Sequence, residues 1–219
     1  MSLRPLAASA LIERYSGLCP YDAITAMCRV RPESFSNRMQ VFIQQSSAGT
    51  NSDILKIQTD GKLILHTSGF ATQSIGSTVL SAGTDYDVTF VRSGNNRSVY
   101  LNGVLELTLN TAESWTKVGE GWLGHYGEDT GAFSLGAVKM WSAALSGSEF
   151  EDERYTYEAV RTSDLQTVSR LLDTSSVGNE VGGGVGWSLV GSVETGAPPS
   201  FPSSGGSGTA NLMKLLILA

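Results

Sequence analysis

The sequence's strongest candidate for acid–base chemistry is the acidic stretch Glu149-Phe150-Glu151-Asp152-Glu153. On a strand, Glu149, Glu151 and Glu153 would share one face. A retaining glycosidase needs two such carboxyl groups about 5–5.5 Å apart. However, the stretch Ser146-Gly147-Ser148-Glu149 has the capping-box pattern, in which Ser and Glu satisfy each other's backbone donors at the start of a helix. On a helix, residues two apart diverge, so the pattern favours an acidic, solvated first turn and no catalytic residue.

A second candidate site is the loop after one predicted strand, where His125 and Tyr126 precede Glu128 and Asp129. His125 and Tyr126 could line a ligand groove. Carboxylate oxygens are ligands that calcium prefers, so Glu128 and Asp129 are the candidate metal ligands, with solvated turn residues as the alternative. The other histidine, His66, lies in a predicted strand and is expected to be partly buried. Two histidines without further Cys or His at ligand spacing do not make a zinc site.

The four tryptophans divide by position. Trp141 and Trp187 lie in apolar runs and are expected in the core, whereas Trp115 and Trp122 lie nearer loops. An exposed aromatic side chain offers a large, rigid contact surface, so Trp115 or Trp122 could stack on a sugar ring or a protein partner. Packing at the rim of the core is the alternative for both.

Short apolar runs separated by turns predict an all-β protein. Two of the turns, Asp60-Gly61 and Asn102-Gly103, are the pairs that favour two-residue hairpins in which both turn residues have positive φ. One helix is expected over 149–160. The predicted strands are Tyr21–Arg31, Arg38–Gln45, Ile54–Thr59, Lys62–Thr67, Thr78–Leu80, Tyr86–Arg92, Val99–Leu101, Val104–Leu109, Gly121–His125, Phe133–Trp141 and Val185–Val193, while Leu165–Leu172 is ambiguous between strand and helix.

Composition excludes some partners. The net charge of −6 and the absence of a Lys/Arg cluster oppose binding to a nucleic-acid backbone. No run of about 20 apolar residues could span a membrane. The apolar stretch Leu6–Ile12 is too short for a signal peptide, so we expect a chain made in the cytoplasm. Cys28 is expected to be a buried thiol in a strand, with a Cys19–Cys28 disulfide as the alternative.

Near residue 195 the composition changes. Residues 1–195 are predicted to form one sandwich domain and 196–219 an extended C-terminal arm, because Pro198-Pro199, Pro202 and Gly205-Gly206 cannot build a packed core. The arm has an apolar end, which favours docking on another subunit over a tail of no consequence. The apolar residues of this end are Leu212, Met213, Leu215, Leu216, Ile217 and Leu218.

Three stretches carry a family resemblance: Ile24–Pro32, Thr84–Glu106 and Gly124–Leu145. Over roughly residues 8–195 the order of strands resembles the laminin-G-like or concanavalin-like sandwich superfamily, of the type found in bacteriophage structural proteins. The resemblance implies an antiparallel jelly-roll sandwich with one short helix. Family members often have an acidic pair where Gly136-Ala137 stand, and this departure weakens a calcium site carried over from the family.

We therefore expect a protein that binds rather than one that catalyses. The first hypothesis is a structural or decoration protein of a phage virion, made in the host cytoplasm. Its sandwich would be exposed and its arm would dock on neighbouring virion proteins or on other copies in a homo-oligomer. The alternative is a carbohydrate-binding module, with calcium as its one candidate cofactor. A glycosidase is a distant third hypothesis.

Overall fold

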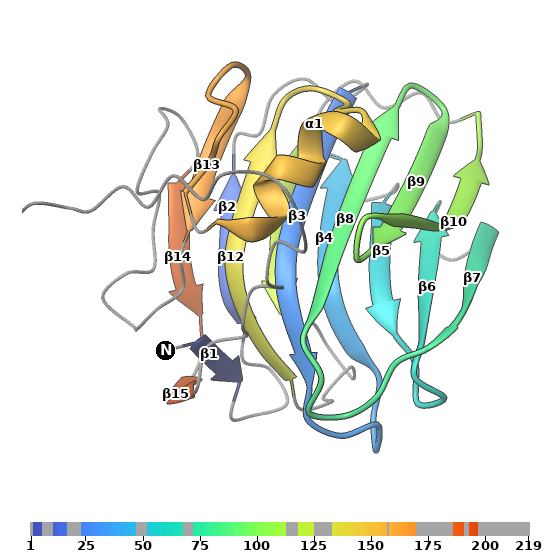
Figure 1. The fold of residues 1–219 in the computed structure, drawn as a ribbon, viewed down its shortest axis with the longest axis vertical. Helices are drawn as coiled ribbons and strands as arrows, with labels where there is room; N and C mark the ends of the chain where they lie inside the picture. The colour runs from blue at the N-terminus through green and yellow to red at the C-terminus, as the bar shows by residue number, and fades with distance from the viewer. Residues whose placement is uncertain are drawn as a thin grey trace, which may run out of the picture.

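The computed structural model describes residues 2–5, 11–16, 23–46, 52–67, 72–112, 118–124, 133–156, 158–169, 186–190 and 193–196. Two antiparallel sheets pack face to face as a sandwich, and one short helical segment lies on the outside of one sheet (Figure 1). This architecture confirms the predicted all-β jelly roll. No described helix has the length and the apolar character that a membrane span needs.

The first sheet has eight strands among the described residues, in the order β10-β9-β8-β3-β12-β1-β15, with β13 also paired to β12. The predicted run Phe133–Trp141 is one of its central strands, with the same ends. The strands are β1 (Ser2–Pro5), β3 (Ala23–Pro32), β8 (Tyr86–Ser93), β9 (Asn96–Leu101), β10 (Val104–Asn110), β12 (Phe133–Trp141), β13 (Leu165–Ser169) and β15 (Val193–Gly196). The predicted boundary near residue 195 stays a prediction.

The second sheet has seven described strands in the order β14-β2-β11-β4-β5-β6-β7. Its edge strand β7 is longer than the predicted strand Thr78–Leu80. The strands are β2 (Leu11–Ser16), β4 (Met39–Ser46), β5 (Ser52–Ile57), β6 (Lys62–Thr67), β7 (Thr72–Val79), β11 (Val118–Gly124) and β14 (Gly186–Val190). Strand β2 therefore includes the last two residues of the apolar stretch Leu6–Ile12.

Apolar side chains from both sheets meet in one core between them. Strict alternation along β4 predicts Val41 in the core and Phe42 outside, but both are buried in the core cluster. The register shifts between Gln40 and Phe42, which pairs with Leu55. Such a bulge places one extra residue opposite its partner strand. The bulge explains why two successive apolar residues share one face.

The two predicted hairpin turns differ from each other. Asn102 and Gly103 both have positive φ, 51° and 80°, as expected for a two-residue turn. At Asp60-Gly61 only Gly61 has positive φ, 80°, and its N–H donates to the carbonyl of Gln58. A three-residue loop with glycine in the left-handed position has this geometry. The hairpin is confirmed there, but the predicted turn type is wrong.

The predicted helix over 149–160 is much shorter in the structure. Helix α1 spans Gly147–Glu151 and a 3₁₀ turn, η2, spans Asp152–Tyr155. Its start is as predicted, because the carboxylate of Glu149 accepts hydrogen bonds from the backbone N–H and the hydroxyl of Ser146, each at 2.8 Å. The helix ends early because the following backbone is held by side chains of the sheet below it, as the site shows.

Candidate functional site

Most of the predicted ligand residues lie outside the part of the chain that the structure describes. Trp115, His125, Tyr126, Glu128 and Asp129 belong to this group. The apolar arm also lies outside it, at Leu212, Met213, Leu215, Leu216, Ile217 and Leu218. Trp122 lies on β11, where its backbone pairs with β4 and β2 but its side chain is not described. These predictions stay open, and the site is built from the outer faces of the two sheets.

The predicted acidic cluster belongs to the cover of the eight-stranded sheet. Helix α1 and η2 cross in front of β12, β3 and β8 (Figure 1). Phe150 is fully buried beneath them and meets the ring of Tyr100 edge-on, with ring centroids 4.7 Å apart. Met27, Val91 and Trp141 complete this second, smaller apolar cluster. The part of this outer face that lies beneath α1 and η2 is therefore buried and closely packed.

Lys139 fixes the chain after the helix. Its ammonium group, on β12, donates to the carboxylate of Glu153 at 2.8 Å and to the backbone carbonyls of Glu153 and Glu158 at 2.9 and 2.7 Å. The Glu153 carboxylate also accepts the N–H groups of Val160 and Arg161. Burial lowers the pKa of Lys139, although the bond to Glu153 opposes this shift. Captured carbonyls cannot continue a helical ladder, so the helix ends here.

Arg154 links the cover to the sheet through two carboxylates. Its Nε donates to Asp87 at 2.7 Å, and its Nη1 donates to Glu151 at 2.7 and 2.8 Å. Burial raises the pKa of Asp87, against the attraction of Arg29 and Arg154. Burial also raises the pKa of Glu151, but hydrogen bonds from Arg154 and Tyr155 outweigh it and leave that pKa below its ordinary value. These buried and half-buried charges therefore hold the cover in place.

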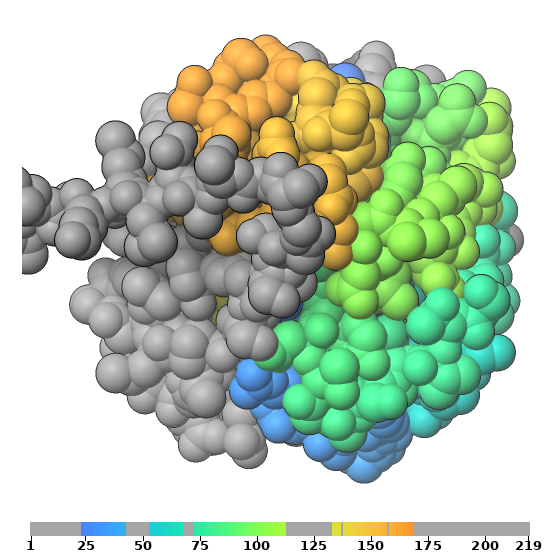
Figure 2. All heavy atoms as spheres, in the orientation of Figure 1, coloured from blue at the N-terminus to red at the C-terminus, as the bar shows by residue number. Residues whose placement is uncertain are grey.

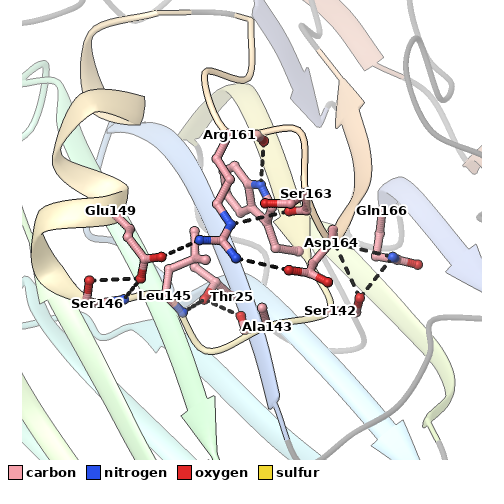
Figure 3. Close-up of polar contacts among 11 residues, drawn as sticks. Thr25, Ser142, Ala143, Leu145, Ser146, Glu149, Arg161, Ser163, Asp164 and Gln166 are labelled. Carbon is pink, nitrogen blue, oxygen red and sulfur yellow. Dashed lines mark hydrogen bonds and ion pairs between the residues drawn. The ribbon is translucent and has the colours of Figure 1, made fainter.

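The end of the cover is closed by Arg161, which makes ion pairs with Glu149 and Asp164 (Figure 3). Its backbone carbonyl accepts the indole N–H of Trp141 at 2.9 Å. On the sheet, Thr25 donates its hydroxyl to Ala143. Each carboxylate of the stretch Glu149, Glu151 and Glu153 thus has a structural partner, which supports the non-catalytic interpretation of the acidic cluster. Figure 2 shows the helical cover and the residues that follow it in yellow and orange beside the green strands.

The outer face of the seven-stranded sheet is built differently. Gln40, Lys56, Ile64 and Ile75 pair across β4, β5, β6 and β7 and form one row. Because Leu55 and its neighbours fill the core, these four residues face away from it. Gln40, Lys56 and Ile64 are nonetheless buried, whereas Ile75 at the edge is 49% exposed. The amide nitrogen of Gln40 has no hydrogen-bond partner among the described residues.

A second row runs beside the first. Trp122 pairs with Ile43, Ile43 with Ile54, Ile54 with His66, and His66 with Gln73. Ile54 is buried, His66 is 9% exposed and Gln73 is exposed. The two rows therefore open toward β7, where Gln73 and Ile75 reach solvent. Alternation along Arg38–Gln45 places Gln40 on the face opposite Met39 and Val41, but it gave no sign that the middle of this outer face is buried, and Gln73 lies outside every predicted strand.

A buried charge cluster lies at one end of the sandwich, between the sheets. Asp53 on β5 accepts the Nε of Arg97 at 3.0 Å and lies 3.5 Å from Nη1 of Arg92. The Nη1 of Arg97 also donates to the carbonyl and the hydroxyl of Thr111. Three fully buried charged side chains tie β5 to β8 and β9 at this end. Arg92 and Arg97 pair across the β8–β9 hairpin, whereas Asp53 comes from a strand of the other sheet. The sequence marks Asp53 as a solvated turn residue or a calcium ligand, and its burial between the two arginines shows that the solvated alternative is wrong.

Cys28 is a free thiol in the core, as expected. Burial raises its pKa far above the ordinary range. The small apolar cavity that it lines has room of about 10 Å³ between Phe42, Phe90 and Val138. A water molecule needs at least that space and two or more polar partners, so this cavity is no ligand site. No group of three His, Cys, Asp or Glu side chains in the described ranges could hold a metal ion.

The strand order, the paired sheets and the covered outer face can be compared with known proteins. A model of the concanavalin A-like lectin/glucanases superfamily, Laminin_G_3, matches residues 9–151. The chain belongs to this superfamily. No curated protein sequence matches the chain. The family assignment confirms the resemblance drawn from the sequence, while a phage origin stays a prediction.

Solved structures share this lectin-like sandwich at low identity. A protein of Bacteroides ovatus that is considered to bind carbohydrate has a TM-score of 0.64 and 15% identity, over 91% of this chain and 61% of that one. The heptameric SAP-like pentraxin of Limulus polyphemus has 0.58 and 14%, over 90% and 95%. Domain 4 of AbnA, a GH43 arabinanase of Geobacillus stearothermophilus solved with arabinotriose, has 0.51 and 19%, over 63% and 68%. At these identities the likeness shows the fold alone.

Proposed function

We propose that this chain is a non-catalytic carbohydrate-binding domain whose ligand contacts the outer face of the seven-stranded sheet. The observation that carries the proposal is the outward-facing amide of Gln40, whose nitrogen is buried without a hydrogen-bond partner among the described residues. Buried polar groups are nearly always satisfied, so an exception calls for an explanation, and a bound ligand is the one we propose here. A sugar hydroxyl is a suitable acceptor for this donor.

The rest of the face has the composition that such a ligand needs. Gln73 and His66 offer hydrogen-bonding groups, and Ile75 offers an apolar surface beside them. Trp122 occupies the register position that begins the row leading to His66. Binding sites combine an apolar lining with a few placed polar groups. The family and the carbohydrate-binding neighbours support this assignment.

The ligand enters from the β7 side. Gln73 and Ile75 are exposed, whereas Gln40 and Lys56 are buried at the other end of the same rows. A glycan on the open strip therefore contacts Gln73 and Ile75 first. Contact with Gln40 follows as the ligand reaches the inner end of the face.

The test is a glycan array with the full chain, followed by calorimetry on the best ligand. Gln40→Met keeps the shape of the side chain but removes the amide. We expect at least a tenfold loss of affinity, because the ligand hydroxyl loses its donor, while thermal stability stays equal or rises. Gln73→Ala and Trp122→Ala are expected to weaken binding as well.

The matched control is Gln166→Met on β13. Gln166 belongs to the eight-stranded sheet, away from the proposed site, and its amide donates a hydrogen bond to the hydroxyl of Ser142. This variant should bind glycan like the unmodified chain. Full affinity in Gln40→Met, Gln73→Ala and Trp122→Ala together would overturn the proposed site. Release of free sugar from a bound glycan would overturn the non-catalytic part of the proposal, and Glu149→Gln would then be tested for its loss.

A second candidate function is a structural part of a larger particle, such as a phage virion. The observation that favours it is the exposed apolar edge formed by β7 and β10, because such patches mark interaction sites. A location in a virion is tested by mass spectrometry of purified particles.

A further inference from the structure

Strand β7 carries the open end of the proposed ligand site and is also the edge of its sheet. Gln73 and Ile75 lie on it, and among the described strands it pairs with β6 alone. It lies beside β10, the edge strand of the eight-stranded sheet (Figure 1). A strand that is paired on one side has fewer bonds to hold it, so the position of the two ligand side chains depends on what else fixes β7.

The ladder between β7 and β6 is interrupted next to Ile75. Ile75 pairs with Ile64 and Val79 pairs with Lys62, so residues 76–78 of β7 lie opposite a single residue of β6. Extra residues in a strand are left out of the ladder. The backbone of residues 76–78 therefore needs partners from elsewhere.

Glu106 on β10 supplies such a partner from the other sheet. The register of β10 with β9 shifts between Leu105 and Leu107, so Glu106 is the extra residue of a bulge, a device that re-aims a side chain. Its carboxylate accepts the backbone N–H and the hydroxyl of Thr78, each at 2.7 Å. We name this contact between Glu106 and Thr78 the clasp, because it joins the edge strands of the two sheets.

Two further features strengthen the clasp. Burial raises the pKa of Glu106, but hydrogen bonds from Thr78 and Ser77 outweigh it and leave that pKa below its ordinary value, so the acceptor is charged at neutral pH. Hydrogen bonds to a charged group are stronger than neutral ones. Gly76 makes room for the carboxylate, because an added Cβ would collide with it, although the φ of Gly76 is not positive. The space, not the backbone conformation, requires glycine here.

The clasp and the ligand residues occupy opposite sides of β7. Ile75 is half-exposed on the outer side, whereas Gly76, which directly follows it, is buried against Glu106. Neighbouring residues of a strand point to opposite faces. Glu106 therefore cannot touch a glycan that lies on Gln73 and Ile75, but it can fix the strand that carries them.

We propose that Glu106 is a positioning residue of the glycan site. Through Thr78 it fixes β7 to the eight-stranded sheet, and it thereby holds Gln73 and Ile75 where the ligand enters. This inference rests on the proposed function. Side chains that are already held lose less freedom when a ligand binds, so the clasp raises affinity without touching the ligand.

The first test measures whether Glu106 acts through β7, by calorimetry on the full chain with the best ligand of the glycan array. Glu106→Gln keeps the shape of the side chain but removes its charge. We expect about a fivefold loss of affinity, in the range of residues that act on a site through intervening structure. The loss should vanish in a Gln73→Ala/Ile75→Ala background, which lacks the β7 contacts, and should persist in full in Gln40→Met on β4.

Asp60→Asn is the matched control for this test. Asp60 also accepts a backbone N–H through a carboxylate oxygen, that of Lys62 at 3.1 Å, but it lies in the turn between β5 and β6. We expect this variant to bind the glycan as tightly as the unmodified chain does.

A second variant replaces the clasp with a bond that can be opened. An added Cβ at Gly76 lies 2.9 Å from Cγ of Glu106, so two cysteines there have Cβ atoms about 4 Å apart, the spacing of a disulfide. Oxidised Gly76→Cys/Glu106→Cys should bind glycan as tightly as the unmodified chain, and dithiothreitol should lower its affinity about fivefold. The unmodified chain, in which Cys28 is a buried free thiol, should bind equally with and without dithiothreitol.

Circular-dichroism spectra establish that each variant is folded at the temperature of the measurement. Full affinity in a folded Glu106→Gln variant, or a loss that persists in full in the Gln73→Ala/Ile75→Ala background, would overturn the inference and leave the proposed function intact. If Glu106→Gln does not fold, equal affinity of the oxidised and reduced cysteine variant would overturn the inference instead. An unmodified chain that binds no glycan would overturn the proposed function and the inference together.

Discussion

The outer faces of the two sheets differ in the hydrogen bonding of their buried polar side chains. On the eight-stranded sheet, Lys139 is buried beneath a helical cover and donates to Glu153, Thr156 and two backbone carbonyls. Asp87 beside it accepts from Arg154 through one oxygen, while its other oxygen has no partner among the described residues. On the seven-stranded sheet, Gln40 is equally buried but its amide nitrogen has no partner among the described residues. A satisfied buried network rigidifies a structure, whereas an unsatisfied group costs free energy until a partner arrives. The first face is thus built for stability and the second has capacity left for a ligand.

The largest expected effect separates the apolar contacts of the two faces. Phe150 is fully buried under the cover and packs on Tyr100, whereas Ile75 on the other face is half-exposed. We expect Phe150→Ala to lower the free energy of unfolding by about 3–5 kcal/mol, through lost transfer energy and a cavity. Ile75→Ala should cost less than about 1 kcal/mol. Urea unfolding followed by tryptophan fluorescence measures both, and equal losses would remove the contrast between the faces.

The next effect separates their polar groups. Lys139→Met leaves the Glu153 carboxylate buried without its ammonium partner, and we expect a loss of about 3 kcal/mol. Gln40→Met on the other face should be neutral or stabilising by up to about 1 kcal/mol, because it removes an unsatisfied amide. Urea unfolding measures both variants. A large loss in Gln40→Met would mean that this amide has a structural partner.

A double variant sharpens the Lys139 result. If Lys139 and Glu153 act mainly on each other, Lys139→Met/Glu153→Gln should cost clearly less than the sum of the two single variants. Additive losses would instead show that each side chain acts mainly through its bonds to the backbone of residues 153–161.

A smaller effect tests how closely the Asn102-Gly103 turn fits the cover. Gly103 and Gly94 both have positive φ, 80° and 57°, so replacement by alanine costs about 1 kcal/mol at either position. An added Cβ at Gly94 meets nothing within 4 Å, whereas at Gly103 it would collide with the side chains of Arg154 and Glu151. We expect Gly103→Ala to cost about 1 kcal/mol more than Gly94→Ala in thermal unfolding. Equal costs would mean that Arg154 moves aside freely.

The sequence predicted the parts of the fold that depend on local patterns. Strand β12 matches its apolar run from Phe133 to Trp141, and the Asn102-Gly103 turn has the expected backbone. The length of the helix could not be predicted, because it depends on Lys139 of the preceding strand, which folds back to bond the carbonyls of Glu153 and Glu158. The bulge at Gln40–Phe42 likewise depends on the register with Leu55.

The candidate site was less predictable than the fold. Alternation along β4 places Gln40 on the face opposite Met39 and Val41, and this is correct, whereas Gln73 lies in the part of β7 that the sequence did not predict as a strand. Burial of Gln40 is a property of the whole face, since its neighbours in the row come from β5 and β6. The aromatic and acidic loop residues drew attention by their types, at Trp115 and from His125 to Asp129. Their side chains depend on loop conformations that no local period encodes.

The smallest expected effect concerns pH and the exposed end of the cover. Hydrogen bonds from the backbone and hydroxyl of Ser146, with the charge of Arg161, hold the pKa of Glu149 below its ordinary value of 4.5. A carboxyl group whose pKa is lowered by folding stabilises the protein above pH 4.5, and this contribution is lost as the pH falls through its folded-state value. Glu149→Gln should therefore unfold at a slightly lower temperature than the unmodified chain at pH 7.

The same variant separates Glu149 from the buried Asp87, which acts in the opposite direction. Because burial raises the pKa of Asp87 above 3.8, its contribution to stability falls as the pH rises from that value through its folded-state pKa. The difference in melting temperature between the unmodified chain and Glu149→Gln should shrink steadily below pH 4.5, since only the Glu149 contribution distinguishes them. Calorimetric scans from pH 7 to pH 3 measure it. A difference that is independent of pH would show that Glu149 acts by packing, and that the charges of Arg161 and Asp164 close the cover without it.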